Sequence, residues 1–429
     1  MARNADRIRA VKGTRDILPP ESRLWLKVEE ICRDILDAYG FQEIRTPIFE
    51  ETELFARSVG TNTDIVSKEM YSFEDRDGRS LTLRPEATAS VMRAYLDSGA
   101  VNQGGVKKYY YSGPMFRRER PQKGRFRQFY QIGAEVLGSD HPTVDVEVLE
   151  MLDLLLERLS LTDCVLLLNS VGCSTCRPAY VEALQSSLES VASKMCADCR
   201  RRTSTNPLRV LDCKVPADQP IIEGLPKILD YLCSECSGHF RAVTSGLDRR
   251  KIRYTITPRL VRGLDYYTRT TFEITHSGLG SQNALLGGGR YDGLSELIGG
   301  PPVKGLGFAI GEDRFLMAVE RSGALASSAG PEVFVAWMGE EAREAALGAA
   351  RQLRREGIRT EIVFDPVNFK KSLALANKMG ARWTLIVGDD EVKRGLFQIK
   401  DMQTGQQEEL PAGRLMEEMR ARRNKSAPV

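Results

Sequence analysis

The fold is indicated most directly by residues 109–138, which read YYYSGPMFRRERPQKGRFRQFYQIGAEVLG. Two segments rich in aromatic and β-branched residues, 106–112 and 126–137, lie on either side of a polar stretch. Runs of this composition around a polar loop are typical of paired strands. This part of the chain therefore predicts a long antiparallel hairpin.

The loop of the hairpin is strongly basic. Residues 117–127 hold one acid, Glu119, and six cations, of which five are arginine. A charge run at a hairpin tip is usually a solvated surface. Arginine, however, binds a phosphate through two parallel hydrogen bonds, whereas lysine acts as a point charge. The composition therefore favours a polyphosphate or nucleic-acid ligand. The cations are Arg117, Arg118, Arg120, Lys123, Arg125 and Arg127.

The segments around the hairpin predict both helices and strands. Apolar residues recur every three or four positions over 20–39 and 141–159, which predicts two amphipathic helices. Residues 41–49, 270–276 and 283–287 have the composition of extended segments. A glycine-rich strand over 304–309 leads into a predicted helix over 312–320.

Composition also divides the chain into domains. We expect a core over residues 1–325, interrupted by a cysteine-rich insertion over 163–253, and an Ala/Ser/Gly-rich linker over 321–331. Residues 332–429 alternate strand and helix patterns, with strands at VFVAWM, IRTEIVF and WTLIVG and helices over 340–356 and 369–379. This alternation predicts a small α/β domain with a partly parallel sheet.

Overall composition narrows the class of protein. The chain has 429 residues, 42% of them hydrophobic, and a net charge of +3. These are globular values, and the charge is too small to indicate a polyanion partner by itself. No apolar run reaches the roughly 18 residues of a membrane span, and the first residues lack the apolar stretch of a signal peptide. We therefore expect a cytoplasmic protein without a membrane partner.

Three further motifs combine polar side chains in ways that suggest a small-molecule pocket. Residues 262–268 read RGLDYYT, residues 82–86 read TLRPE, and QIGAE places Gln131 and Glu135 on one face of a strand. The plain alternatives are core packing for the tyrosines and helix capping for Glu86. No GxxxxGK[ST] motif is present, and the GxGxxxG spacing of GLGFAIG, residues 305–311, is not a dinucleotide fingerprint.

Together these motifs resemble the histidyl-tRNA synthetase family of class II aminoacyl-tRNA synthetases. GFQEIRTPIFE (residues 40–50), the hairpin stretch and GLGFAIGEDRF (residues 305–315) resemble class II motifs 1, 2 and 3. RGLDYYT and GGGRYDGL (residues 287–294) resemble the two signatures of the histidine family. The resemblance implies an α+β catalytic core with an antiparallel sheet flanked by helices. It also implies an inserted subdomain and a C-terminal α/β anticodon-binding domain.

The resemblance further implies an ATP-dependent reaction. The carboxylate of histidine would attack the α-phosphate of ATP to give histidyl-adenylate and pyrophosphate. The acyl group would then move to the terminal ribose of the histidine tRNA, with release of AMP. Mg²⁺ would accompany ATP, and motif 1 would form a homodimer. The implied catalytic residues are Arg117, Arg262 and Arg314. The implied ATP-binding residues are Arg117, Arg125 and Arg314, with Arg125 reaching ATP or the tRNA acceptor end. The implied histidine-binding residues are Glu86, Ala87, Thr88, Gln131, Glu135, Tyr266 and Tyr267.

The insertion has a separate signal in its cysteines. Eight of the nine cysteines lie within 163–253, and six of them form three CxxC pairs. A separation of 19 residues between the first two pairs lies within the spacing of Cys₄ zinc sites. We therefore expect a structural zinc on Cys173, Cys176, Cys196 and Cys199. Cys213, Cys233, Cys236 and His239 are candidates for a second site. The alternative is a set of buried free thiols.

Two other functions remain open. A catalytically inactive regulatory paralogue of ATP phosphoribosyltransferase would resemble the core, but such regulators generally lack the anticodon domain and degrade the signature residues. A zinc-dependent RNA-binding module would explain the insertion but not RGLDYYT. Because Arg117, Arg262 and Arg314 are all present, we expect the ligase.

Overall fold

A computed structural model describes residues 8–61, 63–325, 330–365 and 368–424. The chain divides into two compact units, Met1–Leu325 and Ala326–Val429. The predicted linker over 321–331 begins inside a helix that runs to Ser322, and its residues 326–329 lie outside the described residues. No described helix is both long and apolar enough to cross a membrane.

The first unit is built on an eight-stranded sheet with the strand order β1-β5-β6-β11-β10-β9-β7-β8. Its six inner strands pair antiparallel, and β1 and β8 pair parallel at the two edges. The sheet confirms the predicted fold class. The strands are β1 (Gln42–Glu43), β5 (Lys107–Phe116), β6 (Gln128–Leu137), β7 (Cys164–Ser170), β8 (Thr255–Ile256), β9 (Thr268–His276), β10 (Ala284–Arg290) and β11 (Gly305–Gly311).

The predicted hairpin is confirmed as β5 and β6, with a longer first strand than expected. Pairing continues to Phe116 and Gln128, because each residue of β5 finds a partner across the hairpin. The extended segment over 41–49 is mostly irregular. It supplies β1 and the start of β2 (Phe49–Glu51), and β2 joins β4 (Ser80–Leu83) and β3 (Tyr71–Glu74) in a separate three-stranded sheet.

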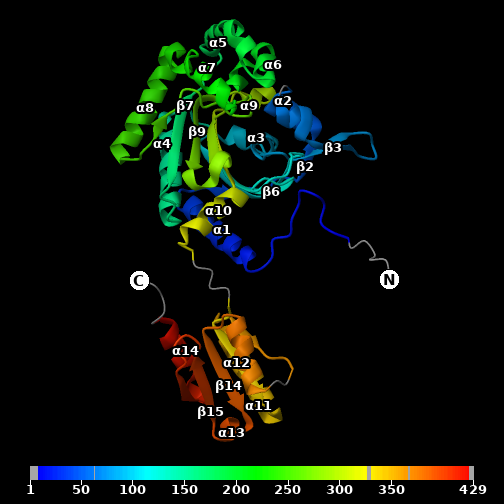
Figure 1. Cartoon of the computed structure of the whole chain (residues 1–429), viewed down its shortest axis with the longest axis vertical. Helices are drawn as coiled ribbons and strands as arrows, with labels where there is room; N and C mark the ends of the chain where they lie inside the picture. The colour runs from blue at the N-terminus through cyan, green and yellow to red at the C-terminus, as the bar shows by residue number, and fades with distance from the viewer. Residues whose placement is uncertain (1–7, 62, 326–329, 366–367, 425–429) are drawn as a thin grey trace. The chain divides into compact units, whose positions relative to one another are not determined.

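Helices cover one face of the large sheet (Figure 1). The two predicted amphipathic helices form α1 (Glu21–Ala38) and α4 (Pro142–Arg158), and α10 (Glu312–Ser322) follows β11. Their apolar sides pack against large side chains of the sheet, among them Ile132, Phe272 and Phe308. Alternation along a strand sends every second side chain to the opposite face, where the polar residues of β6 lie. Other helices of the core are α2 (Thr52–Val59), α3 (Thr88–Asp97) and α9 (Leu294–Leu297).

The cysteine-rich segment forms a helical insertion with its own apolar core (Figure 1). The expected start of the insertion at residue 163 precedes β7, which pairs with β9 in the large sheet. The helical part therefore begins after Ser170, because β7 belongs to the large sheet. Its helices are α5 (Arg177–Val191), α6 (Ala197–Thr205), α7 (Gln219–Glu223) and α8 (Ser234–Arg250).

The second unit is an α/β domain with a partly parallel sheet, as the alternating pattern predicted. Its strand order is β13-β12-β14-β15-β16, with parallel pairs among the first three strands and antiparallel pairs among the last three. The strands are β12 (Val333–Met338), β13 (Thr360–Ile362), β14 (Trp383–Gly388), β15 (Leu396–Asp401) and β16 (Gln407–Pro411). The helices are α11 (Glu340–Arg355), α12 (Phe369–Lys378), α13 (Asp389–Lys393) and α14 (Leu415–Asn424).

Candidate active site

The floor of the site is a strip of small residues beside the polar face of β6. Gln131 and Glu135 pair with Gly311 and Gly307 of β11. At Gly307 an added Cβ would lie 1.7 Å from Oε2 of Glu135. Gly307 thus leaves room for the polar side chain of Glu135 on the neighbouring strand.

Glu135 is the centre of a buried hydrogen-bond network. Only 1% of its surface is exposed. The hydroxyl of Thr88 donates to Oε1 over 2.8 Å, and the hydroxyl of Tyr291 donates to Oε2 over 2.5 Å. Burial outweighs these two donors and raises the pKa of Glu135 to about 8. A carboxyl group in this state exchanges a proton near neutral pH.

Glu86 lies at the start of α3. Its carboxylate accepts hydrogen bonds from the backbone amides of Thr88 (2.7 Å) and Ala89 (3.0 Å). These two hydrogen bonds cap the N-terminus of α3, which is the plain alternative that the sequence offered for Glu86. Each carboxylate oxygen can accept a second hydrogen bond, so capping leaves acceptor capacity for a ligand. Burial raises the pKa of Glu86, and Ala87 beside it is fully buried.

Tyr266 and Tyr267 form an aromatic wall behind this network. Their ring centroids are 4.8 Å apart, and the Tyr266 ring meets that of Tyr291 edge-on at 5.8 Å. Burial raises the pKa of both Tyr266 and Tyr267, so both remain phenols near neutral pH. The rings of both tyrosines pack in a buried cluster with Met92, as the core-packing alternative predicted.

Arg262 is held over the sheet by Glu273 of β9. Its Nη1 donates to Glu273 Oε2. Burial disfavours the guanidinium charge, but Glu273 outweighs it and raises the pKa of Arg262. Gly287 of β10 makes the approach possible, since an added Cβ there would lie 2.4 Å from Nη2 of Arg262. Arg262 therefore stays charged above the glycine strip.

Arg117, Arg125 and Arg314 line one cavity of about 150 Å³ that opens to solvent. Nε of Arg117 donates to the carbonyl of Pro85 over 2.9 Å, and Nε of Arg314 donates to the carbonyl of Gly124 over 3.1 Å. Burial and the nearby cations Arg125 and Arg117 lower the pKa of Arg314. Glu119 lines the same cavity and lies 2.8 Å from Arg125 and 3.9 Å from Arg117. The cations still outnumber this carboxylate, and that excess is suited to a polyanionic ligand.

Arg262 and Gln131 line the same cavity. The described residues offer no hydrogen-bond partner to the buried Oε1 of Gln131 or to the buried Nε of Arg262. Because buried polar atoms are normally paired, these two atoms are suited to contact a polar ligand.

The structure therefore gathers the predicted residues into two adjoining groups along β6. Gln131 lies at the arginine-lined cavity, and Glu135 lies in the tyrosine-lined network four residues further along the same strand face. Tyr291 and Glu273 were missed as partners of Glu135 and Arg262. Tyr291 lies within the quoted GGGRYDG motif, whereas no local signal distinguished Glu273 in its strand.

The cysteines meet in different groups from those predicted. Cys173 and Cys176 lie with Cys233 and Cys236, and Cys196 and Cys199 lie with Cys213 and Asp218. The predicted grouping of Cys173, Cys176, Cys196 and Cys199 is therefore wrong, because the helices of the insertion bring the first and third CxxC pairs together. His239 belongs to neither group, since its Nε2 lies 3.2 Å from Oδ1 of Asp145.

Comparison with known proteins identifies the family of this chain. The profile of the histidyl-tRNA synthetase family matches residues 13–314, and that of an anticodon binding domain matches residues 332–422. The chain is 56% identical to a histidine–tRNA ligase of Solibacter usitatus over 94% of this chain and 96% of the relative. It is 55% identical to that of Koribacter versatilis, over 95% of each chain.

A solved structure extends the likeness to the fold. Apo histidyl-tRNA synthetase of S. aureus superposes with a TM-score of 0.80 at 37% identity, covering 96% of this chain and 99% of the other. The match spans both units and nearly the whole length of the relatives. The chain belongs to the histidyl-tRNA synthetase family.

Proposed function

We propose that this chain, an aminoacyl-tRNA ligase by family, activates histidine with ATP and transfers it to histidine tRNA. The observation that carries the proposal is the pair of groups along β6. A cavity with several arginines adjoins a buried network of a carboxyl group and tyrosines. The first suits a polyphosphate and the second suits a small polar side chain such as imidazole.

The arginines neutralise charge that develops during adenylate formation. Arg117 holds the α-phosphate and Arg314 the γ-phosphate, while Arg125 contacts ATP or the acceptor end of the tRNA. Arg262 lies over the reacting carboxylate and α-phosphate. Phosphoryl chemistry depends chiefly on positioning and charge stabilisation of this kind. Mg²⁺ bound with ATP supplies further neutralisation of the phosphates.

The network around Glu135 selects histidine. Glu135 and a tyrosine contact the two imidazole nitrogens, with Gln131, Tyr266 and Tyr267 around the ligand. Glu86 and Thr88 contact the α-amino group, and Ala87 lies between them. A site built to hydrogen-bond a polar side chain rejects analogues without it by about 10⁴–10⁵-fold. Discrimination of this size needs no separate editing domain.

The remaining partners follow from the two units. The second unit binds the anticodon of histidine tRNA, and the core binds its acceptor end. Residues 40–50 contribute to a homodimer interface, and the protein acts in the cytoplasm. The alternative, an inactive regulator of ATP phosphoribosyltransferase, would not need the anticodon-binding unit that this chain carries.

The decisive experiment is histidine-dependent exchange of pyrophosphate into ATP, without tRNA and with other amino acids as controls. We expect exchange with histidine alone. Arg262→Ala should lower the exchange rate by about 10²–10³-fold, as expected for loss of one preorganised donor at a developing charge. Glu273→Gln should retain more activity than Arg262→Ala.

Two results would contradict this proposal. Absence of exchange in folded protein with Mg²⁺ present would favour the regulatory alternative. Full activity of Arg262→Ala would show that another cation lies at the reacting phosphate.

A further inference from the structure

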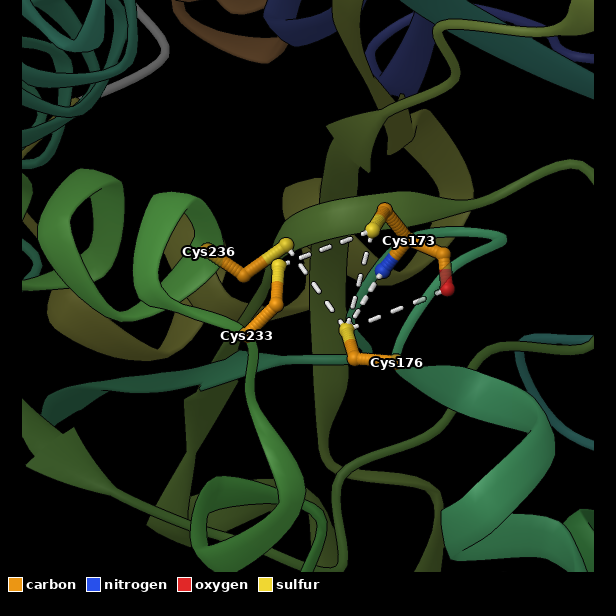
Figure 2. A group of neighbouring side chains, drawn as sticks. All are labelled: Cys173, Cys176, Cys233 and Cys236. Carbon is orange, nitrogen blue, oxygen red and sulfur yellow. Dashed lines mark hydrogen bonds between the residues drawn. The ribbon is translucent and has the colours of Figure 1, made fainter.

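Four cysteine sulfurs converge where the insertion joins the large sheet (Figure 2). The Sγ atoms of Cys173 and Cys176 are 3.7 Å apart, those of Cys173 and Cys233 are 3.9 Å apart, and those of Cys176 and Cys236 are 3.8 Å apart. Four thiolates at the usual Zn–S distance of 2.3 Å in a tetrahedron would be about 3.8 Å apart. All four cysteines are free, and these separations are far longer than a disulfide bond.

Helix ends and backbone amides surround these sulfurs. Cys176 is the N-cap of α5 and Cys233 is the N-cap of α8, so two helix N-termini meet at the cluster. The amide of Cys173 donates to Sγ of Cys176 over 3.2 Å. Gly172 precedes the first pair at a φ of +66°, and a Cβ there would lie 2.8 Å from Sγ of Cys176. A glycine is therefore needed for the loop to close around this sulfur.

We propose that Cys173, Cys176, Cys233 and Cys236 bind one structural Zn²⁺ through four thiolates. The four ligands come from two CxxC pairs that are 60 residues apart in the sequence. The ion joins the loop after β7 to the first turn of α8. Zinc with four cysteine ligands has no open coordination position, so its role is structural rather than catalytic.

The second group offers a less complete ligand set. Its fourth member is Asp218, whose carboxylate already accepts the amide of Cys196 at 3.1 and 3.2 Å and the thiol of Cys213 at 3.3 Å. An aspartate that caps a backbone amide and pairs with a thiol has a satisfied role without a metal. This group supplies the control for the proposed site.

The proposed site is connected to the Tyr266–Tyr267 segment through Arg177, the first residue of α5. Nε of Arg177 donates to the carbonyl of Val171 over 3.1 Å, and its Nη2 donates to the carbonyls of Gly172 (3.3 Å) and Tyr267. The loop also pairs with Arg269 through the Gly172 carbonyl at 2.8 Å. These hydrogen bonds thus connect the cysteine loop directly to the backbone of Tyr267.

The test is zinc content of the full-length protein, purified without metal-chelating resin and dialysed after exposure to Zn²⁺. Wild type should retain about one zinc per chain or more, and the double variant Cys173→Ser/Cys233→Ser should lose about one equivalent. Cys196→Ser/Cys199→Ser should keep at least one equivalent, and Cys164→Ser should match wild type. No zinc in wild type, or equal zinc in wild type and Cys173→Ser/Cys233→Ser, would overturn the proposal.

A second measurement covers the case in which the serine variants do not fold. Co²⁺ replaces zinc in Cys196→Ser/Cys199→Ser, and the absorption spectrum should show tetrahedral cobalt with four thiolates. In wild type, alkylation mapped by mass spectrometry should spare Cys173, Cys176, Cys233 and Cys236 until a chelator removes the metal. Equal alkylation of these four with and without chelator would overturn the site even if zinc is present elsewhere.

Discussion

Single residues set the electrostatics of the buried network that we propose binds histidine, and Glu135 dominates it. Its carboxyl group is buried between Thr88 and Tyr291, and desolvation raises its pKa from 4.5 to about 8. Between these two values the folded protein binds more protons at this position than the unfolded chain. Stability therefore falls as pH rises through this window.

Replacement of Glu135 by glutamine tests this electrostatic effect. The amide of glutamine cannot ionise. The free energy of unfolding of Glu135→Gln should therefore fall less than that of wild type as the pH rises from about 5 to about 8. Urea unfolding at both pH values measures the difference. Glu223→Gln, at an exposed carboxylate of α7, should follow wild type. Parallel pH dependence in wild type and Glu135→Gln would mean that Glu135 is already ionised at pH 5.

Gly307 tests the steric side of the same site. A Cβ at this position would overlap Oε2 of Glu135, so Gly307→Ala must displace that carboxyl group. Overpacking of this kind costs about 1–3 kcal/mol. If that cost falls on histidine binding, KM for histidine should rise by about 5–150-fold. Pyrophosphate exchange over a range of histidine concentrations measures it. Gly293→Ala is the matched control, because no atom lies within 4 Å of its added Cβ. An unchanged KM in Gly307→Ala would separate Glu135 from histidine binding.

At the scale of elements, a buried ion pair connects α4 to β10. Arg290 and Asp145 are both 0% exposed, with Nη2 of Arg290 2.6 Å and Nε 2.9 Å from Oδ2 of Asp145. Arg290 also donates to the carbonyls of Ser139 (3.0 Å) and His141 (3.1 Å), and His239 of α8 contacts the same aspartate. Three elements far apart in the chain thus share one polar centre beneath the GGGRYDG strand.

Loss of this pair should be strongly destabilising. Arg290→Met leaves Asp145 buried without its guanidinium partner, although His239 still contacts it. Breaking a buried ion pair in this way costs about 3–5 kcal/mol. Arg250→Gln removes an exposed pair between α8 and α4, with Glu150 at 2.6 Å, and should cost about 0–1 kcal/mol. Denaturant unfolding of the core unit measures both. An equal loss in the free energy of unfolding for the two variants would contradict the expectation that the buried ion pair is more costly to break than the exposed one.

The elements themselves were largely predictable from the sequence. The apolar period of α1 and α4 and the composition of β5 and β6 are local signals, and the structure confirms them. The ends of β5 and the pairing of β1 were not predictable, because a strand continues wherever a partner strand is present. The partner of β1 is a distant strand, and no local pattern identifies it.

At the scale of the whole molecule, all proposed histidine and ATP contacts lie in the first unit, while the anticodon binding domain lies in the second. Chemistry and anticodon recognition are thus separated in sequence. When two binding modules on one chain contact the same tRNA, binding at one raises the effective concentration of the tRNA at the other. Loss of either module therefore weakens the overall affinity for the tRNA.

Removal of the second unit should therefore affect histidine activation and tRNA charging differently. A chain ending at Leu325 should retain histidine-dependent pyrophosphate exchange, because its site residues are intact. Its kcat/KM for charging histidine tRNA should fall by about 10²–10⁴-fold, the range expected when one of two linked contacts is lost. Charging assays with full-length and truncated protein measure the ratio. Equal loss of both activities would indicate that the catalytic unit depends on the second unit.

Short-range patterns in the sequence account for the element types, the division into an α+β core and an α/β domain, and the signature residues of the family. These features depend on composition and spacing within short segments, which local geometry translates directly into helices, strands and loops. The pairs of residues that meet across the fold are visible in the tertiary structure alone. Tyr291 reaches Glu135 across 156 residues of sequence, and Cys176 meets Cys236 across 60. Such pairings follow from strand order and helix packing, which act between segments that are distant in the sequence.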